Sequence, residues 1–183
     1  MFFIQLKDLF KSYGPIKALN GLSLKVPKGS LYGLLGPNGC GKTTTIGMML
    51  GLIKPTSGTV FINGQNIENE KDRTKILEKV NFISPYVELP KKLTVKQNLE
   101  IYGRLYGVKN LDEKIKEIAE ELTLIDLLNK KTGELSSGQK NRVSLAKSLI
   151  NDPEILFLDE PTASLDPDVG DYVRGYIQSY KKK

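Results

Sequence analysis

The chain has 183 residues, of which 39% are apolar and 26% charged, with a formal net charge of +6 and no histidine. These values indicate one globular domain, and no apolar run approaches the roughly 18 residues that a membrane-spanning helix requires. The basic residues are spread along the chain, so the charge predicts a solvated surface rather than a nucleic-acid site.

The N-terminal third of the chain has the pattern of short strands separated by turns. Apolar runs at residues 2–9, 22–26, 31–35 and 59–62 are divided by glycine and proline, as at Gly14-Pro15 and Gly58. We therefore expect a strand-rich part here, in which residues 31–35 form the strand that leads into the next motif.

A glycine-rich loop follows that run. Its residues are Gly36, Pro37, Asn38, Gly39, Cys40, Gly41, Lys42 and Thr43, which match the pattern G-x-x-x-x-G-K-[ST]. The glycines let backbone amides turn inward around an anion, the following helix points its positive end at the same place, and Lys42 adds a mobile charge. The segment from Gly36 to Thr44 therefore predicts binding of a magnesium nucleoside triphosphate. Thr43 would hold the metal, and Cys40 fills a slot that must be small.

Residues 94–150 change to helical spacing. Apolar positions recur every three or four residues, first at Val95, Leu99, Tyr102 and Tyr106 and then at Leu111, Ile115, Ile118 and Leu122. This pattern predicts a helical lobe inserted into the strand-rich part.

A second strand with carboxylates at its end follows the lobe. The continuous apolar run at residues 155–158 predicts a parallel strand covered on both faces, and Asp159 and Glu160 come directly after it. Asp159 would accept from magnesium or its waters, and Glu160 would orient or deprotonate the water that attacks the γ-phosphate. Apolar spacing at residues 169–180 predicts a last helix. Strands that alternate with helices predict an α/β fold with a mainly parallel sheet.

The segment Leu135-Ser136-Ser137-Gly138-Gln139 stands at the start of a helical run. Ser136 is predicted to cap that helix. The helix start is also a second anion site, which the phosphate loop of the same chain does not need. A spare phosphate site indicates a partner chain.

Taken together, these segments resemble the ATP-binding subunit of ABC transporters over essentially all 183 residues. GPNGCGKTT matches the family's first nucleotide motif, LSSGQ resembles its LSGGQ signature, and ILFLDEPT matches its magnesium strand. Ser164-Leu165-Asp166 matches the family's dimer-contact loop, and Tyr13 stands where the family places an aromatic residue against adenine.

The resemblance implies a P-loop NTPase fold in a single domain, with an N-terminal antiparallel β part and a mainly parallel central sheet. Residues 1–85 and 151–183 would form the nucleotide-binding core, and residues 86–150 the helical subdomain. The resemblance also implies ATP and Mg²⁺ as ligands, and a head-to-tail homodimer. In that dimer each ATP would lie between one chain's phosphate loop and the other chain's Ser136, Ser137, Gly138 and Gln139, with Asp166 at the contact. The helical subdomain would face an integral membrane transporter subunit.

Three features depart from the family pattern. The expected glutamine after the strand near residue 83 is missing, and its slot holds Pro85 or, with a shift of one residue, Tyr86. Ser137 replaces the first glycine of the signature. The chain stops at Lys183, before the strand on which the family carries a histidine. We therefore expect a chain that lacks the C-terminal part of the usual domain and that binds ATP with impaired hydrolysis.

The leading hypothesis is the ATP-hydrolysing subunit of a transporter, with the phrase LTVKQNLEIYGRLYG favouring an exporter. The sole cysteine and the lack of a signal-peptide pattern fit a cytoplasmic protein. The resemblance implies that this protein is peripheral on the inner face of the cell membrane. One alternative is a soluble ATPase of the same superfamily that acts on nucleic acid or ribosomes, and the absence of tandem nucleotide domains or a long coiled coil counts against it. Another is a nucleotide-binding module that does not hydrolyse ATP.

Overall fold

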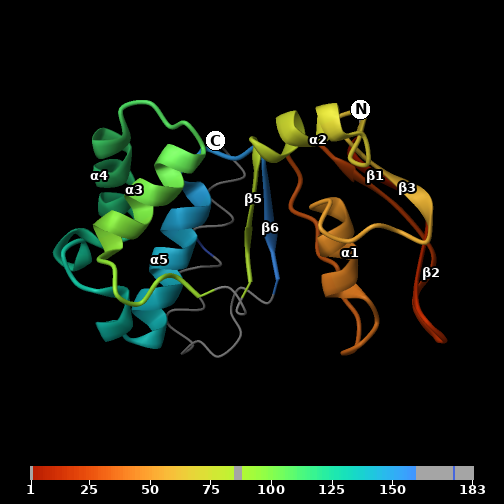
Figure 1. Ribbon diagram of the computed structural model, residues 1–183, viewed down its shortest axis with the longest axis horizontal. Coiled ribbons are helices and arrows are strands. Elements are labelled where there is room, and N and C mark those ends of the chain that lie inside the picture. The colour runs from red at the N-terminus through yellow and green to blue at the C-terminus, as the bar shows by residue number, and fades with distance from the viewer. Residues whose placement is uncertain (1, 85–87, 160–174, 176–183) are drawn as a thin grey trace. The chain divides into compact units, whose positions relative to one another are not determined.

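The computed structural model describes residues 2–84, 88–159 and 175. These residues form two compact units, an N-terminal unit that ends at Leu77 and a C-terminal unit that begins at Glu78. Strands β1 to β4 belong to the N-terminal unit and helices α3 to α5 to the C-terminal unit. Figure 1 labels β1 to β3 and these three helices. Apart from Gly175, the predicted last helix lies outside the described residues.

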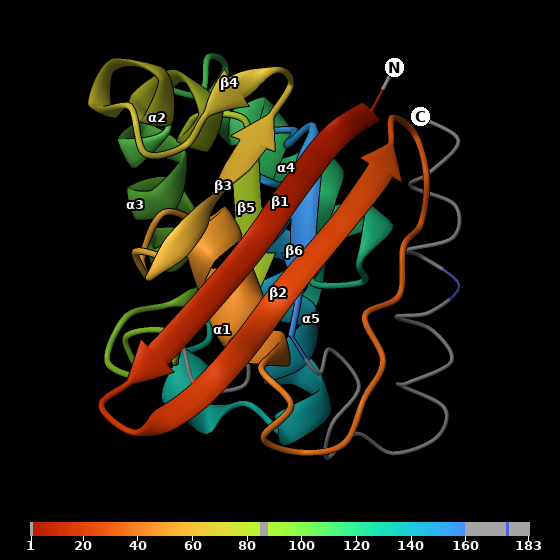
Figure 2. The ribbon, with the colours of Figure 1, turned by 90° about the vertical axis from the view of Figure 1, so that its right-hand side faces the viewer.

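The N-terminal unit is built on an antiparallel sheet with the strand order β2-β1-β3-β4. Its strands are β1 (Phe2–Tyr13), β2 (Ile16–Pro27), β3 (Ser57–Ile62) and β4 (Gln65–Asn66). Strands β1 and β2 form a long hairpin, and β3 lies along the other edge of β1 (Figure 2). The predicted strand-rich part is confirmed, although the first two strands are longer than the sequence pattern indicates.

A bulge at Asp8 sets which side chains of β1 face the core. Ile4 and Leu6 point inward and are 6% and 2% exposed, and Leu9, three residues after Leu6, is 0% exposed. Side chains of a strand alternate between two faces, so Leu6 and Leu9 can share a face only if an extra residue intervenes. Asp8, with φ of 45° at a register shift, is that residue. Gly58 passes so close that a Cβ there would collide with the Asp8 carbonyl oxygen.

The prediction of a strand at residues 31–35 is wrong. Residues 30–37 have no regular secondary structure, and Leu31, Tyr32 and Leu35 are 58%, 51% and 92% exposed. A strand needs a neighbour on which its backbone can form a hydrogen-bonded ladder. In the part of the chain that the structure describes, no strand pairs with this segment. An irregular connection therefore leads from β2 to the phosphate loop.

Two helices complete the N-terminal unit. Helix α1 (Lys42–Met49) follows the phosphate loop, contacts β3 and buries Thr45, Met48 and Met49. Helix α2 (Glu70–Leu77) follows β4 and has Glu70 and Asp72 in its first turn and Lys75 in its last. The helix dipole favours acidic residues in the first turn and basic residues in the last turn, so these charges stabilise the helix.

The C-terminal unit contains a pair of parallel strands, β5 (Val80–Ile83) and β6 (Ile155–Leu158). Phe82 lies opposite Phe157 in this pair. The predicted strand at residues 155–158 is therefore confirmed. Burial on both faces is met only in part, because Phe157 is buried while the other three residues of β6 are half-buried.

Three α-helices of the C-terminal unit pack against one another, namely α3 (Val95–Leu105), α4 (Leu111–Glu121) and α5 (Ser137–Leu149). Two short 3₁₀ helices, Ile125–Leu127 and Thr132–Glu134, lie between α4 and α5. Leu99, Ile115, Leu122 and Val143 are at most 2% exposed and form the centre of this packing. The predicted helical lobe is thus confirmed, and the spacing of its apolar residues marks the buried faces.

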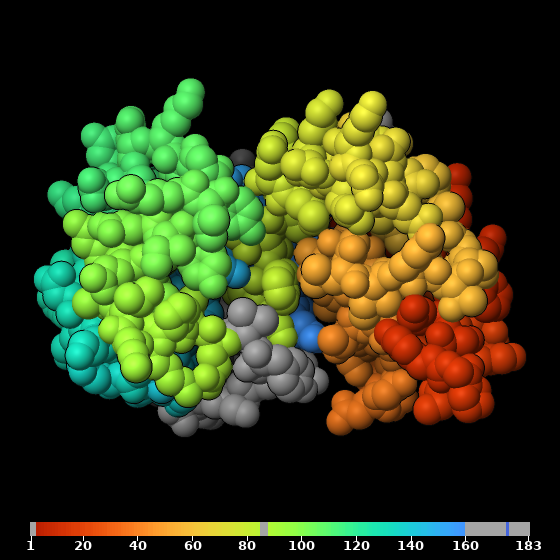
Figure 3. All heavy atoms as spheres, viewed as in Figure 1, coloured from red at the N-terminus to blue at the C-terminus, as the bar shows by residue number. Residues whose placement is uncertain are grey.

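Helix α3 keeps part of one side at the molecular surface. Ile101 and Leu105 are 45% and 75% exposed, and Figure 3 shows the lime-green atoms of this region on the visible face of the C-terminal unit. Among the described residues, no helix combines the length and the apolar character that crossing a membrane requires.

Candidate nucleotide-binding site

The phosphate loop of the N-terminal unit turns tightly between Pro37 and Gly41. The Cys40 amide donates to the Pro37 carbonyl oxygen (3.3 Å), and Gly39 and Gly41 have left-handed backbones with φ of 81° and 93°. A Cβ on Gly41 would lie 2.6 Å from the Ala18 carbonyl oxygen, so this end of the loop is pressed against β2. The turn therefore needs glycine at position 41 both for its backbone angle and for the contact with β2.

Lys42 folds its side chain back over the loop that precedes it. Its ammonium donates to the carbonyl oxygens of Gly36 (2.8 Å) and Pro37 (3.0 Å). Lys42 is also the first residue of α1, whose positive end lies at the same place. An ammonium group and the start of a helix therefore converge at this loop, which is the arrangement that binds the phosphates of a nucleotide.

Two smaller residues complete the loop. A Cβ on Gly36 would lie 2.6 Å from the Cys40 Sγ, so Gly36 provides the room that the cysteine occupies. Cys40 is nevertheless exposed. The packing role predicted for Cys40 is therefore limited to its close approach to Gly36.

The two predicted metal ligands lie in different units. Thr43 is exposed in the first turn of α1, and Asp159 is 6% exposed directly after β6. The Asp159 amide donates to the Ile83 carbonyl oxygen (2.9 Å), which fixes the residue to the end of β5. A hydroxyl and a carboxylate are both hard oxygen donors of the kind that Mg²⁺ prefers, so each side chain by itself has the chemistry that the metal needs. Glu160 and Asp166 lie outside the described residues, as do Pro85 and Tyr86.

The signature segment forms the start of α5, as expected. Ser136 caps the helix by accepting from the Gln139 amide (3.3 Å), while the Gln139 side chain accepts from the Ser136 amide (3.0 Å). The predicted cap is therefore confirmed as a reciprocal capping box. Leu135 is buried and anchors the segment, whereas Ser136 and Ser137 are exposed. The Ser136 hydroxyl accepts one bond here and keeps its own O–H to donate to an external anion.

Tyr13 ends β1 with its side chain 48% exposed. The Lys11 ammonium lies 4.8 Å from the centre of the tyrosine ring and donates to the Lys54 carbonyl oxygen (2.8 Å). The cation over the ring fixes its orientation. A ring held in this way can stack on a flat aromatic ligand, as the predicted contact with adenine requires.

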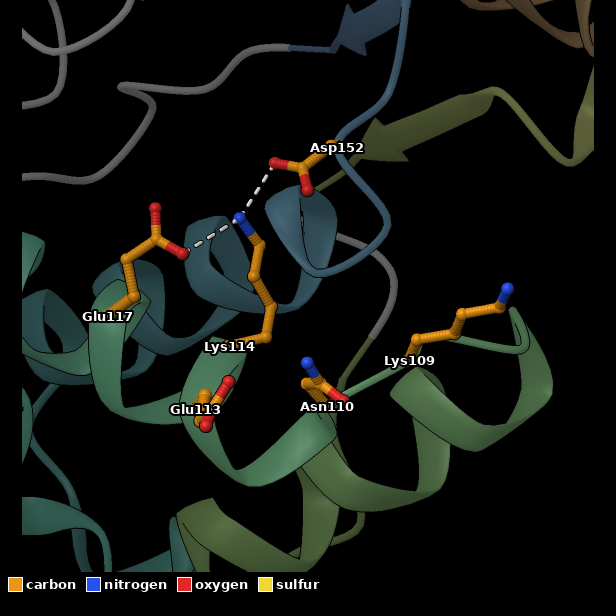
Figure 4. A pocket seen from close by; sticks show the side chains of 6 residues that line it. All are labelled: Lys109, Asn110, Glu113, Lys114, Glu117 and Asp152. Carbon is orange, nitrogen blue, oxygen red and sulfur yellow. Dashed lines mark hydrogen bonds and ion pairs between the residues drawn. The ribbon is translucent and has the colours of Figure 1, made fainter.

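A cavity of about 400 Å³ in the C-terminal unit does not resemble a phosphate site. Figure 4 shows Lys114 directed at Asp152 and Glu117, to which it donates at 2.8 and 3.2 Å, while Lys109 points away. Burial lowers the pKa of Lys114, but the hydrogen bonds to the two carboxylates outweigh this and raise the pKa above its usual value. The Lys114 ammonium is thus already neutralised by two carboxylates.

One feature near α5 was not singled out by sequence reasoning. Lys147 is 8% exposed and lies among apolar side chains of the helix. Its position four residues after the buried Val143 was the available signal, because residues at this spacing share a helix face. The spacing of apolar residues alone does not reveal a buried cation on the same helix face.

The arrangement defines a class of protein before any relative is considered. An α/β fold, a glycine-rich loop at the start of α1 and a capped signature segment at the start of α5 are the parts of a P-loop nucleotide-binding cassette. The family model described as ABC transporter matches residues 19–163. This chain belongs to the ABC transporter family.

Individual relatives agree with the family assignment. The chain is 39% identical to the Nod factor export ATP-binding protein I of Burkholderia lata, over 90% of this chain and 54% of the relative. It is 41% identical to the bacitracin transport ATP-binding protein BcrA of Bacillus licheniformis, over 98% of this chain and 58% of the relative. The chain thus spans about half the length of the curated relatives it matches.

A solved structure agrees with the fold. It is the dimeric structure of a post-hydrolysis state of an ATP-binding cassette bound to ADP and Pi. The match has a TM-score of 0.87 at 29% identity, and it covers 97% of this chain and 82% of that one. The predicted fold class is thereby confirmed.

Proposed function

We propose that this chain binds ATP with Mg²⁺ as the nucleotide-binding subunit of a transporter. The observation that carries this proposal is the phosphate loop, in which Gly39 and Gly41 set the turn and the Lys42 ammonium lies over the loop at the start of α1. When triphosphate oxygens enter, they replace the Gly36 and Pro37 carbonyl oxygens as acceptors for Lys42. The exchange is favourable because a charged acceptor makes a stronger hydrogen bond than a neutral one.

The remaining roles follow the resemblance, residue by residue. Tyr13 stacks on the adenine, Asn38 and Cys40 contribute loop amides with their neighbours, and Thr44 lies beside the phosphates. Thr43 and Asp159 hold Mg²⁺, which neutralises charge on the phosphate oxygens. Glu160 orients the attacking water. We expect slow turnover, because the slot of the water-positioning glutamine holds Pro85 or Tyr86.

The second half of each site comes from a second copy of the chain. Ser136 and Ser137 are exposed at the helix start and Gly138 is half-buried beside them. The Ser136 hydroxyl retains a donor for the partner's γ-phosphate. Asp166 contributes to the dimer contact. The name of the solved relative describes a dimeric cassette, which supports this assembly.

ATP-driven pairing of two such chains would drive a separate integral membrane subunit, with the cassette peripheral on the cytoplasmic face of the cell membrane. An export role is supported by the names of relatives, which include a Nod factor export protein and a daunorubicin resistance protein. The helical subdomain of residues 86–150 would face the membrane subunit. Residues 1–85 and 151–183 would form the nucleotide-binding core.

The proposal is tested by titrating the chain with a fluorescent ATP analogue in the presence of Mg²⁺. Lys42→Ala should weaken binding about 10- to 100-fold, which corresponds to the loss of a charge-assisted hydrogen bond. Lys71→Ala is the matched control, because Lys71 lies in the first turn of the other helix of the same unit, away from the loop. Equal affinities for the two variants would contradict the proposal.

A further inference from the structure

The side chain of Lys147 is a buried cation at the junction of α5, α3 and β5. Lys147 is 8% exposed, and burial lowers the pKa of its ammonium. Lysine is rarely buried to this extent without a charged partner. Among the described residues, Lys147 makes no ion pair.

Aromatic rings take the place of a carboxylate. The Lys147 Nζ lies 5.0 Å from the ring centre of Tyr102 on α3 and 5.5 Å from that of Phe82 on β5. It also donates to the Asn81 Oδ1 at 3.4 Å. Cation–π contacts gain strength when water is excluded, so the two rings offset part of the cost of burying the charge. The ammonium therefore joins three elements that come from distant parts of the sequence.

A polar network fixes the Asn81 end of this junction. The Asn81 amide group donates to the Asn151 Oδ1 (2.9 Å), and the Asn151 amide group donates to the Glu78 carbonyl oxygen (3.0 Å). The backbone amide of Phe82 donates to the Asn81 Oδ1 (2.9 Å). Because Asn81 is held from several sides, the position of Lys147 is tied to the backbone of β5.

The junction lies between two parts of the proposed site. Lys147 is on the same helix as the signature segment, which starts α5 at Ser136. Phe82 is followed by Ile83, whose carbonyl oxygen accepts from the Asp159 amide at 2.9 Å. Through two residues of β5, the ammonium thus connects the signature helix with the carboxylate predicted to hold magnesium.

Stability alone does not account for such a residue. Replacing a buried charge by an apolar side chain of similar volume is often neutral or stabilising. A methionine could fill the space between Tyr102 and Phe82, but it could not hold both rings and Asn81 through a charge. What the ammonium adds is a fixed geometry between helix and strand.

We propose that Lys147 is a positioning residue that holds the signature helix α5 in register with the carboxyl end of β5. The segment Ser136–Gln139 serves the partner's ATP, whereas Asp159 serves the chain's own ATP. One cluster of side chains therefore fixes elements of both ATP sites of the dimer. The roles of Ser136–Gln139 and Asp159 in this inference rest on the proposed function. The attachment of α5 to β5 through Lys147 does not depend on nucleotide.

The first test measures ATP-driven dimerisation by sedimentation, with Glu160→Gln in all chains to prevent turnover. Lys147→Met should weaken dimerisation about tenfold or more, the loss expected for a desolvated cation–π contact. The dissociation constant of a fluorescent ATP analogue from the monomer should change less than about threefold. Lys147→Arg should restore dimerisation, because a guanidinium also stacks on aromatic rings. Lys116→Met, an exposed lysine of α4, is the control.

Unchanged dimerisation of Lys147→Met, or an equal loss in Lys147→Arg, would overturn the proposal. A second measurement needs no nucleotide. Hydrogen exchange of the Phe82 and Asp159 amides should accelerate about tenfold in Lys147→Met, with Ile118 of α4 as the internal reference. Equal acceleration in α4 would show a loss of global stability alone and also overturn it.

The two proposals fail in different ways. If the unmodified chain does not dimerise with ATP and Mg²⁺, the proposed function fails while the exchange measurement still decides the role of Lys147. If Lys147→Met does not fold, Tyr102→Leu removes one ring and leaves the lysine in place. It should weaken dimerisation in the same direction, and wild-type dimerisation in that variant would contradict the proposal.

Discussion

The starts of helices α1 and α5 differ in how their first backbone amides are treated. The first amides of any helix lack partners within the helix. Helix α1 begins after Gly41, a left-handed residue that makes no side-chain cap. Helix α5 begins at Ser136, where a reciprocal capping box engages Ser136 and Gln139 with each other. The first helix start thus favours an anion as its cap, whereas the second already has a side-chain cap for one of its amides, that of Gln139.

This difference fits the separate roles proposed for the two segments. The loop before α1 would bind nucleotide whenever it is present. The start of α5 would make its contact only when a second chain approaches, and until then its own side chains keep the helix intact. Substitutions at one helix start that leave the other intact therefore test whether the two segments have separate roles.

The largest effect is expected for Gly41→Ala. An L-residue is strained at φ of 93°, and its Cβ would meet the Ala18 carbonyl oxygen at 2.6 Å. We expect the free energy of unfolding to fall by about 3 kcal/mol, from left-handed strain plus overpacking. Nucleotide binding should be lost with it. Urea unfolding and titration with a fluorescent ATP analogue measure the two effects.

Gly39→Ala separates the cost of a left-handed backbone from the cost of a Cβ that collides with β2. Gly39 has φ of 81°, but a Cβ there would have nothing within 4 Å. The loss should then be about 1 kcal/mol, the cost of the left-handed backbone alone. Equal losses for the two variants would show that the contact between the loop and β2 contributes nothing to stability.

These two glycines also show what the sequence could predict. The loop motif is local, so its glycines and Lys42 were identifiable without any tertiary information. The strand expected at residues 31–35 failed because a strand depends on a neighbour distant in the sequence, which no pattern of apolar residues guarantees. The ends of β1 and β2 were missed for a related reason, since the bulge at Asp8 interrupts the alternation that defines a strand.

The next effect in size is expected for Ser136→Ala, with Thr94→Ala as its matched control. Both residues form a capping box, Ser136 at the start of α5 and Thr94 at the start of α3. Each substitution should lower the free energy of unfolding by about 1 kcal/mol. Only Ser136→Ala should also weaken ATP-driven dimerisation, because only that hydroxyl is proposed to contact the partner's ATP. Equal dimerisation of the two variants would mean that Ser136 acts solely as a cap.

The capping residues mark the limit of local prediction in the C-terminal unit. Ser136 was identified as a cap because its bonds span only three residues of the chain. The spacing from Val143 places Lys147 on the buried face of α5, but the rings that it contacts lie on α3 and β5, which no local pattern of α5 identifies.

A smaller effect is expected in the pH dependence of stability at Lys147. Burial lowers its folded pKa below the usual value of 10.5. Below the folded pKa both states carry the proton, so the folded state bears the full cost of the buried charge. Between the folded pKa and 10.5, the unfolded state binds more protons, and stability therefore rises with pH in this window.

The comparison with Lys147→Met isolates this contribution. The wild-type free energy of unfolding should rise relative to that of the variant as the pH increases towards 10.5, while the titrations of distant exposed lysines, which the two chains share, cancel. Urea unfolding at a series of pH values measures the difference. A constant difference would show that the Lys147 ammonium is not desolvated.

The smallest effect concerns a third helix start, that of α4. Its first turn carries Asp112 and Glu113 after Asn110, which makes no side-chain cap. Carboxylates near a helix start interact favourably with its dipole, so Glu113→Gln should cost about 0.5 kcal/mol at low ionic strength. The loss should disappear at high salt, because exposed charges are screened. Glu120→Gln in the last turn of α4 should cost less, since a negative charge there opposes the dipole and its ion pair with Lys116 (3.9 Å) is exposed. A salt-independent loss at Glu113 would instead indicate a specific contact of its side chain. The start of α4 would then resemble that of α5, which its own side chains cap, and not that of α1.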